Sequence, residues 1–397
     1  MPQSRLRLVE VLLIPVSFLC AVFSTTAAAQ SPKAPFEMSW TAGSCRNCQI
    51  VHSLGEMVPT GTPTIWANGY YFPTEGQGSG DYSVVRSVDS GRHWVEIPKS
   101  RMHAVEPSIS FIDSKSGWIS GMSSDATSWV LRTNDGGRHW TPVSDHFIQN
   151  MQFINKMMAV GDEFDGTTDQ FAKTTDGGRT WETSALPGLK FASKVLFLNP
   201  EVGWIAGTNT LSDDLTGRVA VVLRTTDGGK HWASFQIPSQ TGVAEIRDLF
   251  FLNESLGWLI TWHYNNDGTH LYLTTDGGRT WRLHPDQGIQ GPGKWLSVVR
   301  FLNSKSGFAF SRDDRVEATV EPPAIGVLAV AEAGPTDTGQ LLYTDDGGEH
   351  WRSRPINASV YDCQVLGQGL RCTASKDKSS FLMLQIETSP CPTTENK

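Results

Sequence analysis

The sequence predicts an all-β fold in which one four-stranded unit is repeated along the chain. An eight-residue pattern, Ser/Thr-x-Asp-x-Gly-x-(Thr/His)-Trp, occurs six times, with Trp-to-Trp intervals of 46, 41, 51, 49 and 70 residues. A Phe-led apolar run with a following Gly-Trp, or a variant of it, lies upstream of most copies. No long window shows the 3.6-residue periodicity of a helix. A four-stranded unit of this length, repeated around an axis, is the sequence signature of a β-propeller.

The first 29 residues have the features of a signal peptide. Arg5 and Arg7 precede an uncharged run over 11–23, and Ala27 and Ala29 form a small-residue cleavage site. The apolar run is too short for a typical membrane span, although a retained N-terminal anchor is the alternative. We therefore expect the mature protein to be secreted, periplasmic or otherwise extracytoplasmic.

Each repeat can be assigned four strands. The Phe-led run is the first strand and the Gly-Trp run is the second. A third strand leads into the Asp-Gly turn, and the fourth begins at the Trp that ends the pattern. Asp before Gly between apolar runs favours a hairpin, because Gly accepts positive φ and the carboxylate can accept backbone N–H bonds in its own turn. We expect a structural role for these six aspartates: Asp89, Asp135, Asp176, Asp227, Asp276 and Asp346.

The repeats predict one propeller domain over 30–397. The six turns, which mark six blades, lie at 87–94, 133–140, 174–181, 225–232, 274–281 and 344–351. Residues 355–388 offer three more strands without an Asp turn, and 36–41 can supply the fourth. Pairing the first strand with the last would close a ring of seven blades. Six blades followed by a tail is the alternative.

The cysteines suggest disulfides, which an exported chain can form. Cys363 and Cys372 flank a Gly-Gln-Gly centre, so a hairpin there places them opposite each other. Cys45 and Cys48 fit a small-loop disulfide, or one of them can pair with Cys391. The spacing lacks the second pair that a structural zinc site would need, so we expect neither a metal nor a cofactor.

The composition is globular and acidic. The chain has 33 Lys and Arg against 41 Asp and Glu, with 39% hydrophobic residues. An acidic chain argues against general nucleic-acid binding, which needs basic residues to neutralise phosphates. We expect a monomer that binds another protein.

The turn pattern resembles the Asp-box, also called the BNR repeat, of sialidases, sortilin-type receptors, xyloglucan-active glycosidases and the photosystem II assembly factors. Together with the Gly-Trp element, it is most similar to the photosystem II assembly factor family. That resemblance implies a single seven-bladed propeller that acts without catalysis and binds a membrane protein during complex assembly. The chain departs from the family in being acidic and lacking an arginine cluster.

Binding residues are expected on the face opposite the Asp turns, where the loops between second and third strands and between blades lie. These loops are rich in acidic residues, which would attract a basic protein segment. Trp262, His263 and Tyr264 suit stacking on an aromatic side chain or a sugar. The full set of candidates is Glu106, Glu163, Asp165, Lys194, Arg247, Trp262, His263, Tyr264, Asp267 and Arg312. The long insertion that starts at Arg312 and runs to Thr338 is a candidate lid or docking arm.

No catalytic residue can be assigned. A sialidase would need three arginines for the substrate carboxylate and a Tyr nucleophile, and the early Arg-Ile-Pro motif is absent. A glycosidase would need two carboxylates at a set separation, which the sequence cannot show. We therefore expect a binding or assembly scaffold and favour the absence of enzymatic activity. Carbohydrate binding or hydrolysis is the alternative.

Overall fold

The computed structural model describes residues 36–46, 53–59, 63–71, 81–97, 102–103, 107–123, 125–210, 218–238, 244–263, 268–285, 295–312, 339–376 and 381–388. All of them belong to the unit Phe36–Lys397, and none of them is helical. The part of the chain described here therefore holds no helix long and apolar enough to span a membrane. The expected leader over 1–29 lies outside these residues.

Five separate sheets each contain four antiparallel strands. The first comprises β7 (Ser108–Phe111), β8 (Gly117–Met122), β9 (Ser128–Thr133) and β10 (Thr141–Ser144). The second comprises β11 (Gln149–Phe153), β12 (Ala159–Phe164), β13 (Asp169–Thr174) and β14 (Glu182–Ala185). The third comprises β15 (Phe191–Phe197), β16 (Gly203–Thr208), β17 (Ala220–Thr225) and β18 (Ala233–Gln236). The fourth comprises β19 (Ala244–Phe251), β20 (Gly257–His263), β21 (Gly268–Thr274) and β22 (Arg282–Leu283). The fifth comprises β23 (Trp295–Phe301), β24 (Gly307–Arg312), β25 (Gly339–Thr344) and β26 (Arg352–Ile356).

A nine-stranded sheet joins two further four-stranded runs. One run is β2 (Ser53–Pro59), β3 (Ile65–Tyr71), β4 (Asp81–Ser87) and β5 (His93–Glu96), with β6 (Met102–His103) paired to β4. The other is β27 (Ser359–Leu366), β28 (Gly369–Ser375), β29 (Phe381–Thr388) and β1 (Phe36–Arg46). The runs meet where the end of β1 lies parallel to β5. The described strands thus form seven four-stranded runs.

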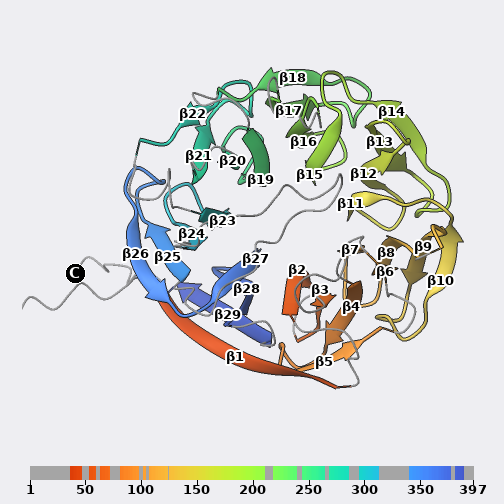
Figure 1. Cartoon of the computed structure of the whole chain (residues 1–397), viewed down its shortest axis with the longest axis horizontal. Coiled ribbons are helices and arrows are strands. Elements are labelled where there is room, and N and C mark those ends of the chain that lie inside the picture. Colours follow the sequence, from red (N-terminus) through yellow and green to blue (C-terminus); the bar gives the residue numbers. More distant parts are fainter. Residues whose placement is uncertain are drawn as a thin grey trace, which may run out of the picture. The chain divides into compact units, whose positions relative to one another are not determined.

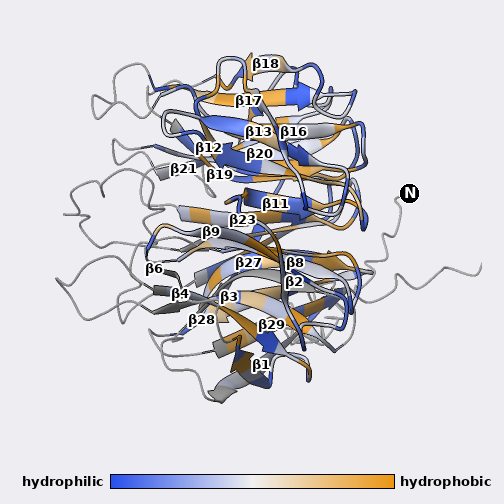
Figure 2. Ribbon diagram, turned by 90° about the vertical axis from the view of Figure 1, so that its right-hand side faces the viewer, coloured by the Kyte–Doolittle hydropathy of each residue, from blue (hydrophilic) through white to orange (hydrophobic). Residues whose placement is uncertain are grey.

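The first strands of the seven runs form a closed ring of contacts. In order, β2, β7, β11, β15, β19, β23 and β27 each contact the next, and β27 contacts β2. Figure 1 shows these strands around a central axis, with the fourth strands at the rim. This arrangement is a β-propeller, so the predicted all-β propeller is confirmed. Figure 2 shows apolar and polar residues throughout the strands, and the second strands β8, β16 and β20 are buried over most of their length, as expected where a sheet is covered on both faces.

Each Asp turn is stabilised from within, and the turn around Asp227 is typical. The backbone N–H of His231 donates to Oδ1 of Asp227 at 3.0 Å, and the ring Nδ1 of His231 lies 2.6 Å from Oδ2. The Thr225 hydroxyl donates to the same carboxylate and accepts the N–H of Gly229. Gly228 and Gly229 have φ of 72° and 87°, the left-handed region that suits glycine.

Tryptophan links neighbouring blades, and Trp204 is typical. The indole N–H of Trp204 donates at 2.8 Å to the carbonyl of Gly277, which lies in the Asp turn of the following blade. The Trp204 ring stacks on Phe251 of that blade at 3.7 Å, and Trp281 meets Phe251 edge-on. The Gly-Trp element, the Phe-led strand and the turn Trp therefore form one interface between neighbouring sheets.

The blade of β11–β14 lacks the Gly-Trp element. Val160 stands where four other blades have Trp, and Phe171 from β13 supplies the ring instead. Phe171 packs beside Phe197 at 6.0 Å and meets Trp232 edge-on at 5.2 Å. An aromatic side chain from the third strand thus replaces one from the second.

The inner strands are coupled across blades by side chains that cap exposed backbone N–H groups. Ser108 and Ser110 on β7 accept the N–H groups of Met151 and Phe153 on β11. Asp248 on β19 likewise accepts the N–H of Val299 at 2.9 Å. These bonds satisfy donors that have no strand partner at the inner edge of each sheet.

Arg300 on β23 ties three inner strands together. It donates to Asp248 on β19 at 2.6 Å and to Asp362 on β27 at 3.2 Å. Its Nε also donates to the carbonyl of Cys363. The Arg300 side chain is nearly buried, and the two carboxylates balance its charge in place of water.

The last blade has the N-terminal strand as its rim strand. β1 pairs antiparallel with β29 from Phe36 opposite Thr388 to Gly43 opposite Phe381. Within this blade, Cys363 on β27 and Cys372 on β28 form a disulfide. Cys45 lies on β1, but its side chain is outside the described residues, as are Cys48 and Cys391.

Candidate functional site

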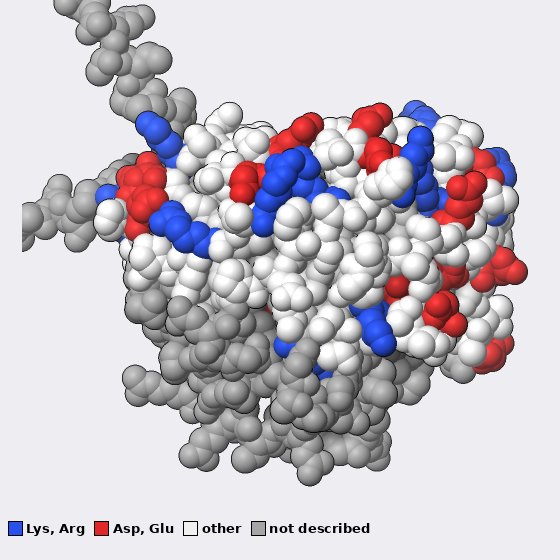
Figure 3. All heavy atoms as spheres, turned by 90° about the horizontal axis from the view of Figure 1, so that it is seen from above, with Lys and Arg blue, Asp and Glu red and all other residues white. Residues whose placement is uncertain are grey.

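The topology divides the connections between two faces of the ring. The Asp turns and the turns between first and second strands lie on one face, here called the turn face. They are bonded to each other: the N–H of Gly228 donates to the carbonyl of Glu201, and Gly277 donates to Ser255 in the same way. Connections between second and third strands, and between blades, lie on the opposite face, here called the loop face. Seen from the rim (Figure 3), Lys and Arg are interspersed with Asp and Glu, so the described atoms there form no patch of one charge.

A cluster of aromatic and charged side chains, here called the Trp262 cluster, occupies the loop face. Its members are Arg218, Glu245, Arg247, Trp262 and Trp295. The Arg247 guanidinium lies over the Trp262 ring, 4.9 Å from its centroid, and the Trp295 ring lies 5.9 Å from Trp262 at an angle of 40°. Arg247, Trp262 and Trp295 are all half-buried. The cluster therefore presents indole and guanidinium groups that are partly accessible.

Strand geometry brings this cluster together. The register between β19 and β20 shifts between Ile246 and Asp248, which makes Arg247 the extra residue of a β-bulge. Such bulges redirect a side chain from its sheet. Trp262 is the penultimate residue of β20, opposite Glu245. Trp295 begins β23 in the next blade, so the cluster crosses a blade boundary.

An ion pair supports the cluster from below. Nη1 of Arg218, which precedes β17, lies 2.6 Å from Oε1 of Glu245. Arg218 is only 7% exposed, so the pair is largely desolvated. Removing one partner would leave a buried charge unmatched, which makes this pair a structural support and not a free recognition group.

His263 lies under the surface. It is 1% exposed, its Nε2 lies 3.0 Å from the Thr261 hydroxyl, and its ring packs against His270 with centroids 4.4 Å apart. Its neighbour Trp262 points to the other side of β20, as alternation along a strand requires. The structure therefore assigns His263 to packing, whereas Trp262 is accessible.

Glu163, Asp165 and Lys194 lie elsewhere on the loop face. Glu163 contacts His146, whose Nδ1 lies 2.9 Å and 3.0 Å from the two carboxylate oxygens of Glu163. Asp165 accepts the backbone N–H groups of Thr167 and Thr168 within its own loop, which lowers its pKa. Lys194 is half-buried on β15, next to a register shift.

Four other candidates lie outside the described side chains. Glu106, Tyr264 and Asp267 are not among the described residues. Arg312 ends β24, where its backbone is in register with Trp295 and Gly339, but its side chain is outside them. The insertion after it is also outside, so its expected role as a lid or docking arm stays a prediction.

Two aspartates form a buried acidic pair in the blade of β11–β14. Asp162 is fully buried, and its Oδ1 accepts the amide of Asn150 at 2.9 Å. Burial, together with the charge of Asp169, raises the pKa of Asp162 well above its usual range. Burial also raises the pKa of Asp169 to about 6, although the N–H of Ala192 donates to it. Because both are enclosed, neither is placed to act on a substrate at the surface.

Sequence reasoning missed Trp295 as a partner of Trp262. The two are 33 positions apart and in different blades, so no local pattern relates them. It also gave no role to the His or Thr before the turn Trp. In the structure, Thr180 donates its hydroxyl to Oδ2 of Asp176 at 2.7 Å, just as His231 contacts Asp227. Both residue types complete the same turn.

Comparisons with known proteins agree with this fold. No family model matches the chain. The photosystem II assembly lipoprotein Ycf48 of Synechococcus sp. (strain CC9902) is 22% identical over 276 residues, which cover 62% of this chain and 74% of that protein. A solved structure of YCF48 bound to D1 peptide has a TM-score of 0.55 and 13% identity, and it covers 90% of this chain and 99% of that one.

Carbohydrate-active propellers share the fold as well. The GH74 enzyme of Niastella koreensis has a TM-score of 0.55 and 12% identity, over 85% of this chain. The match spans only 54% of that enzyme's length. The chain is thus similar to Ycf48 in sequence and in fold, as the turn pattern predicted, and to the glycosidase in fold alone.

Proposed function

We propose that this protein is an exported, non-catalytic propeller that binds a protein partner and serves as an assembly scaffold. The observation that carries the proposal is the Trp262 cluster. Trp and Arg dominate the energetics of protein interfaces because they bury large surfaces and make directional contacts. Here Arg247 is already stacked on Trp262, so little side-chain freedom would be lost on binding.

The similarity to Ycf48 supports a protein as the ligand. Ycf48 of Synechococcus is named as a photosystem II assembly lipoprotein, and YCF48 has been solved with a D1 peptide. By analogy, the partner is a segment of an extracytoplasmic or membrane protein that is exposed during assembly. The acidic composition of this chain argues that the client differs from that of the photosynthetic proteins.

The described carboxylates favour binding over hydrolysis. Asp165 is held in its own loop, Glu163 contacts His146, and Glu245 contacts Arg218. A glycosidase would need two carboxylates about 5 to 10 Å apart across a substrate bond.

The test is affinity capture from cross-linked envelope of the host. Tagged protein should enrich one membrane complex, as measured by quantitative mass spectrometry. The double variant Arg247→Ala/Trp262→Ala should lose that complex. Arg138→Ala, which removes an exposed arginine from the turn face, is the matched control and should retain it.

Two results would overturn the proposal. The first is the absence of any reproducibly enriched protein. The second is equal enrichment by the wild type and the double variant while circular dichroism shows both folded. Binding or cleavage of an oligosaccharide that depends on Trp262 and Trp295 would instead support the carbohydrate alternative.

A further inference from the structure

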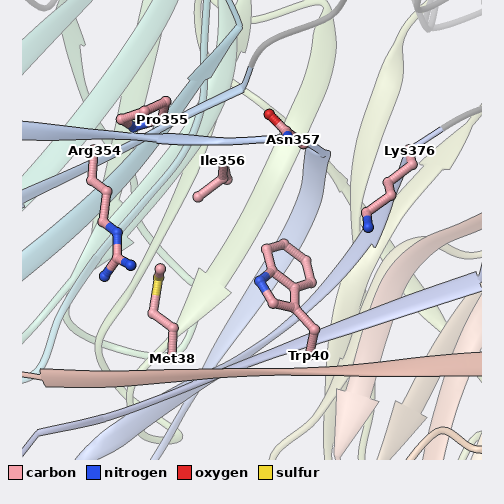
Figure 4. Close-up of a pocket in the computed structure, with 7 residues that line it drawn as sticks. All are labelled: Met38, Trp40, Arg354, Pro355, Ile356, Asn357 and Lys376. Carbon is pink, nitrogen blue, oxygen red and sulfur yellow. The ribbon is translucent and has the colours of Figure 1, made fainter.

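A second surface feature lies at the rim, where two blades meet. A groove of about 390 Å³ runs between the rim strands β26 and β1. It is lined by Met38 and Trp40 from β1, Arg354 and Ile356 from β26, Asn357, and Lys376 after β28. Figure 4 shows the Arg354 guanidinium turned towards Met38 and the Lys376 side chain turned towards Trp40.

The start of β1 is explained by packing. Phe36 lies opposite Thr388, the last residue of β29. In another blade the turn Trp232 has the same position, next to Thr225 at the end of the third strand. Phe36 is 4% exposed, and its ring meets Phe308 at 5.2 Å and Tyr343 at 5.0 Å, both edge-on. It takes the place of the turn Trp in the blade that has no Asp turn.

The residues after Phe36 are not explained by packing. Met38 and Trp40 follow on the same side of β1, two and four positions later. The equivalent positions of three other rim strands are small or polar: Thr183 and Ala185, Ser234 and Gln236, and Ser353 and Pro355. In β22 the first of these positions is Leu283, which packs against the core. Most of the compared blades therefore form without large apolar residues at these positions.

Trp40 is accessible, unlike the tryptophans that hold the blades together. It is 39% exposed, and it is the one Trp among the exposed large hydrophobic residues of the described chain. With Met38 it forms an apolar floor. An exposed indole beside a thioether is unfavourable in water and typical of a binding surface.

The groove is also positively charged. Arg354 and Lys376 line it, and none of its lining residues is acidic. Among the described residues, no carboxylate forms a salt bridge with Arg354. A comparable groove beside the Asp turn of β17 and β18 differs, because Asp227 lines it together with Arg224 and Arg279. Charge complementarity thus points to an anionic ligand at the first groove, whose lining has no carboxylate.

The backbone of this groove suits an extended chain. Among the described strands, β26 pairs with β25 alone, and the outer edge of β1 is paired only over Ser44–Arg46, with β5. The edges of the two strands that flank the groove therefore offer backbone donors and acceptors over most of their length. Such edges accept an added peptide strand, while side-chain pockets set its specificity.

We propose that this groove binds an extended, acidic segment of a protein partner. Aromatic or aliphatic side chains of the segment would lie on Trp40 and Met38, and its carboxylates would lie between Arg354 and Lys376. The site is separate from the Trp262 cluster and does not depend on it.

The test uses fluorescein-labelled nine-residue peptides and fluorescence anisotropy with the full mature chain. One peptide alternates Asp or Glu with Phe or Leu, and a second has Lys in place of each acidic residue. The acidic peptide should bind at least about tenfold more tightly, and its affinity should fall as salt is raised.

Variants localise the binding. Met38→Thr/Trp40→Ala, which restores the small residues of other blades, should weaken acidic-peptide binding by about tenfold or more, and so should Arg354→Ala. Arg352→Ala removes a cation from the same strand outside the groove and should change affinity less than about twofold. Because Trp40 and Arg354 are exposed, each variant should keep the wild-type melting temperature, which is measured in parallel.

Equal affinity for the two peptides, or wild-type affinity in the folded groove variants, would overturn the proposal. Binding of polygalacturonate that the same variants abolish, without peptide binding, would also overturn it. The double variant at Arg247 and Trp262 should bind the acidic peptide normally. Failure at this groove is therefore distinguishable from failure of the proposed function.

Discussion

The two faces of the ring are built on different principles. On the turn face, six Asp turns repeat the same set of hydrogen bonds, and each aspartate is satisfied within its own turn. On the loop face, each blade has its own side chains, and the Trp262 cluster draws on three blades. Residues that the fold requires recur in register, whereas residues available for binding occur once.

The difference gives a criterion for reading a repeat protein. Asp227 and Trp204 are prominent because they recur, yet recurrence marks them as structural. Trp262, Met38 and Trp40 depart from the repeat, and each is at least partly accessible. Departures from the repeat are therefore the better guide to function.

The largest loss of stability is expected from a substitution at a blade interface near the turn face. Trp204→Ala removes a buried ring that stacks on Phe251 and an N–H that donates to Gly277. We expect the free energy of unfolding in urea to fall by about 3 to 5 kcal/mol. Trp40→Ala, the matched control at an exposed Trp, should cost less than about 1 kcal/mol. Similar losses for both would contradict the interface role of Trp204.

A smaller effect is expected within one Asp turn. Asp276→Ala removes the acceptor for the N–H groups of Arg279 and Thr280 and for the Thr280 and Thr274 hydroxyls. We expect a loss of roughly 1 to 3 kcal/mol in urea unfolding. Asp165→Ala on the loop face is the comparison and should cost less than about 0.5 kcal/mol. A larger loss at Asp165 would reverse the contrast between the faces.

The turn aspartates should also make the protein sensitive to acid. Desolvation raises the pKa of Asp276, but the hydrogen bonds from Thr280, Thr274 and Arg279 outweigh it and lower the pKa to about 2. A depressed pKa stabilises the fold above the unfolded value near 4, and that stability is lost as the pH falls towards 2. Urea midpoints measured between pH 4 and pH 2 should fall steeply, and less steeply in Asp276→Ala.

The smallest expected effect has the opposite sign and comes from the buried pair. Burial raises the pKa of Asp169 to about 6, so the folded state binds its proton more tightly than the unfolded state does. Stability should therefore rise as the pH falls from about 6 to about 4. Asp169→Asn should raise stability at pH 7.5 by about 1 kcal/mol and flatten this rise. Unchanged urea midpoints across that range in the wild type would show that Asp169 is ionised throughout.

The propeller could be predicted from sequence because its signals are local. Every hydrogen bond of Asp227 to its turn lies within eight residues, so one short pattern describes the whole turn. The pairing of Cys363 with Cys372 is likewise contained in one hairpin. Local patterns of this kind are visible without any knowledge of the tertiary structure.

The candidate sites are harder to predict from the sequence because their residues are far apart along the chain. Trp295 meets Trp262 only because blades are adjacent, and His263 is buried only because strand alternation turns it inward. The rim groove did leave a trace in the sequence. Phe36, Met38 and Trp40 alternate with polar residues, which gives β1 one apolar side. The packing of Phe36 explains only the first residue of that side.

The strand β1 has a consequence for how the ring is made. Its partner β29 lies at the far end of the chain, from Phe381 to Thr388, so the two ends must meet before the last blade is complete. Closing so long a loop costs only a few kcal/mol of chain entropy, yet contacts this remote in sequence form late. Six blades can pack from local contacts while the ring is still open. Until β1 pairs with β29, the edge of β29 is unpaired and a strand of another chain could bind there. The time between packing of the six blades and pairing of β1 is therefore the period in which strand exchange can occur.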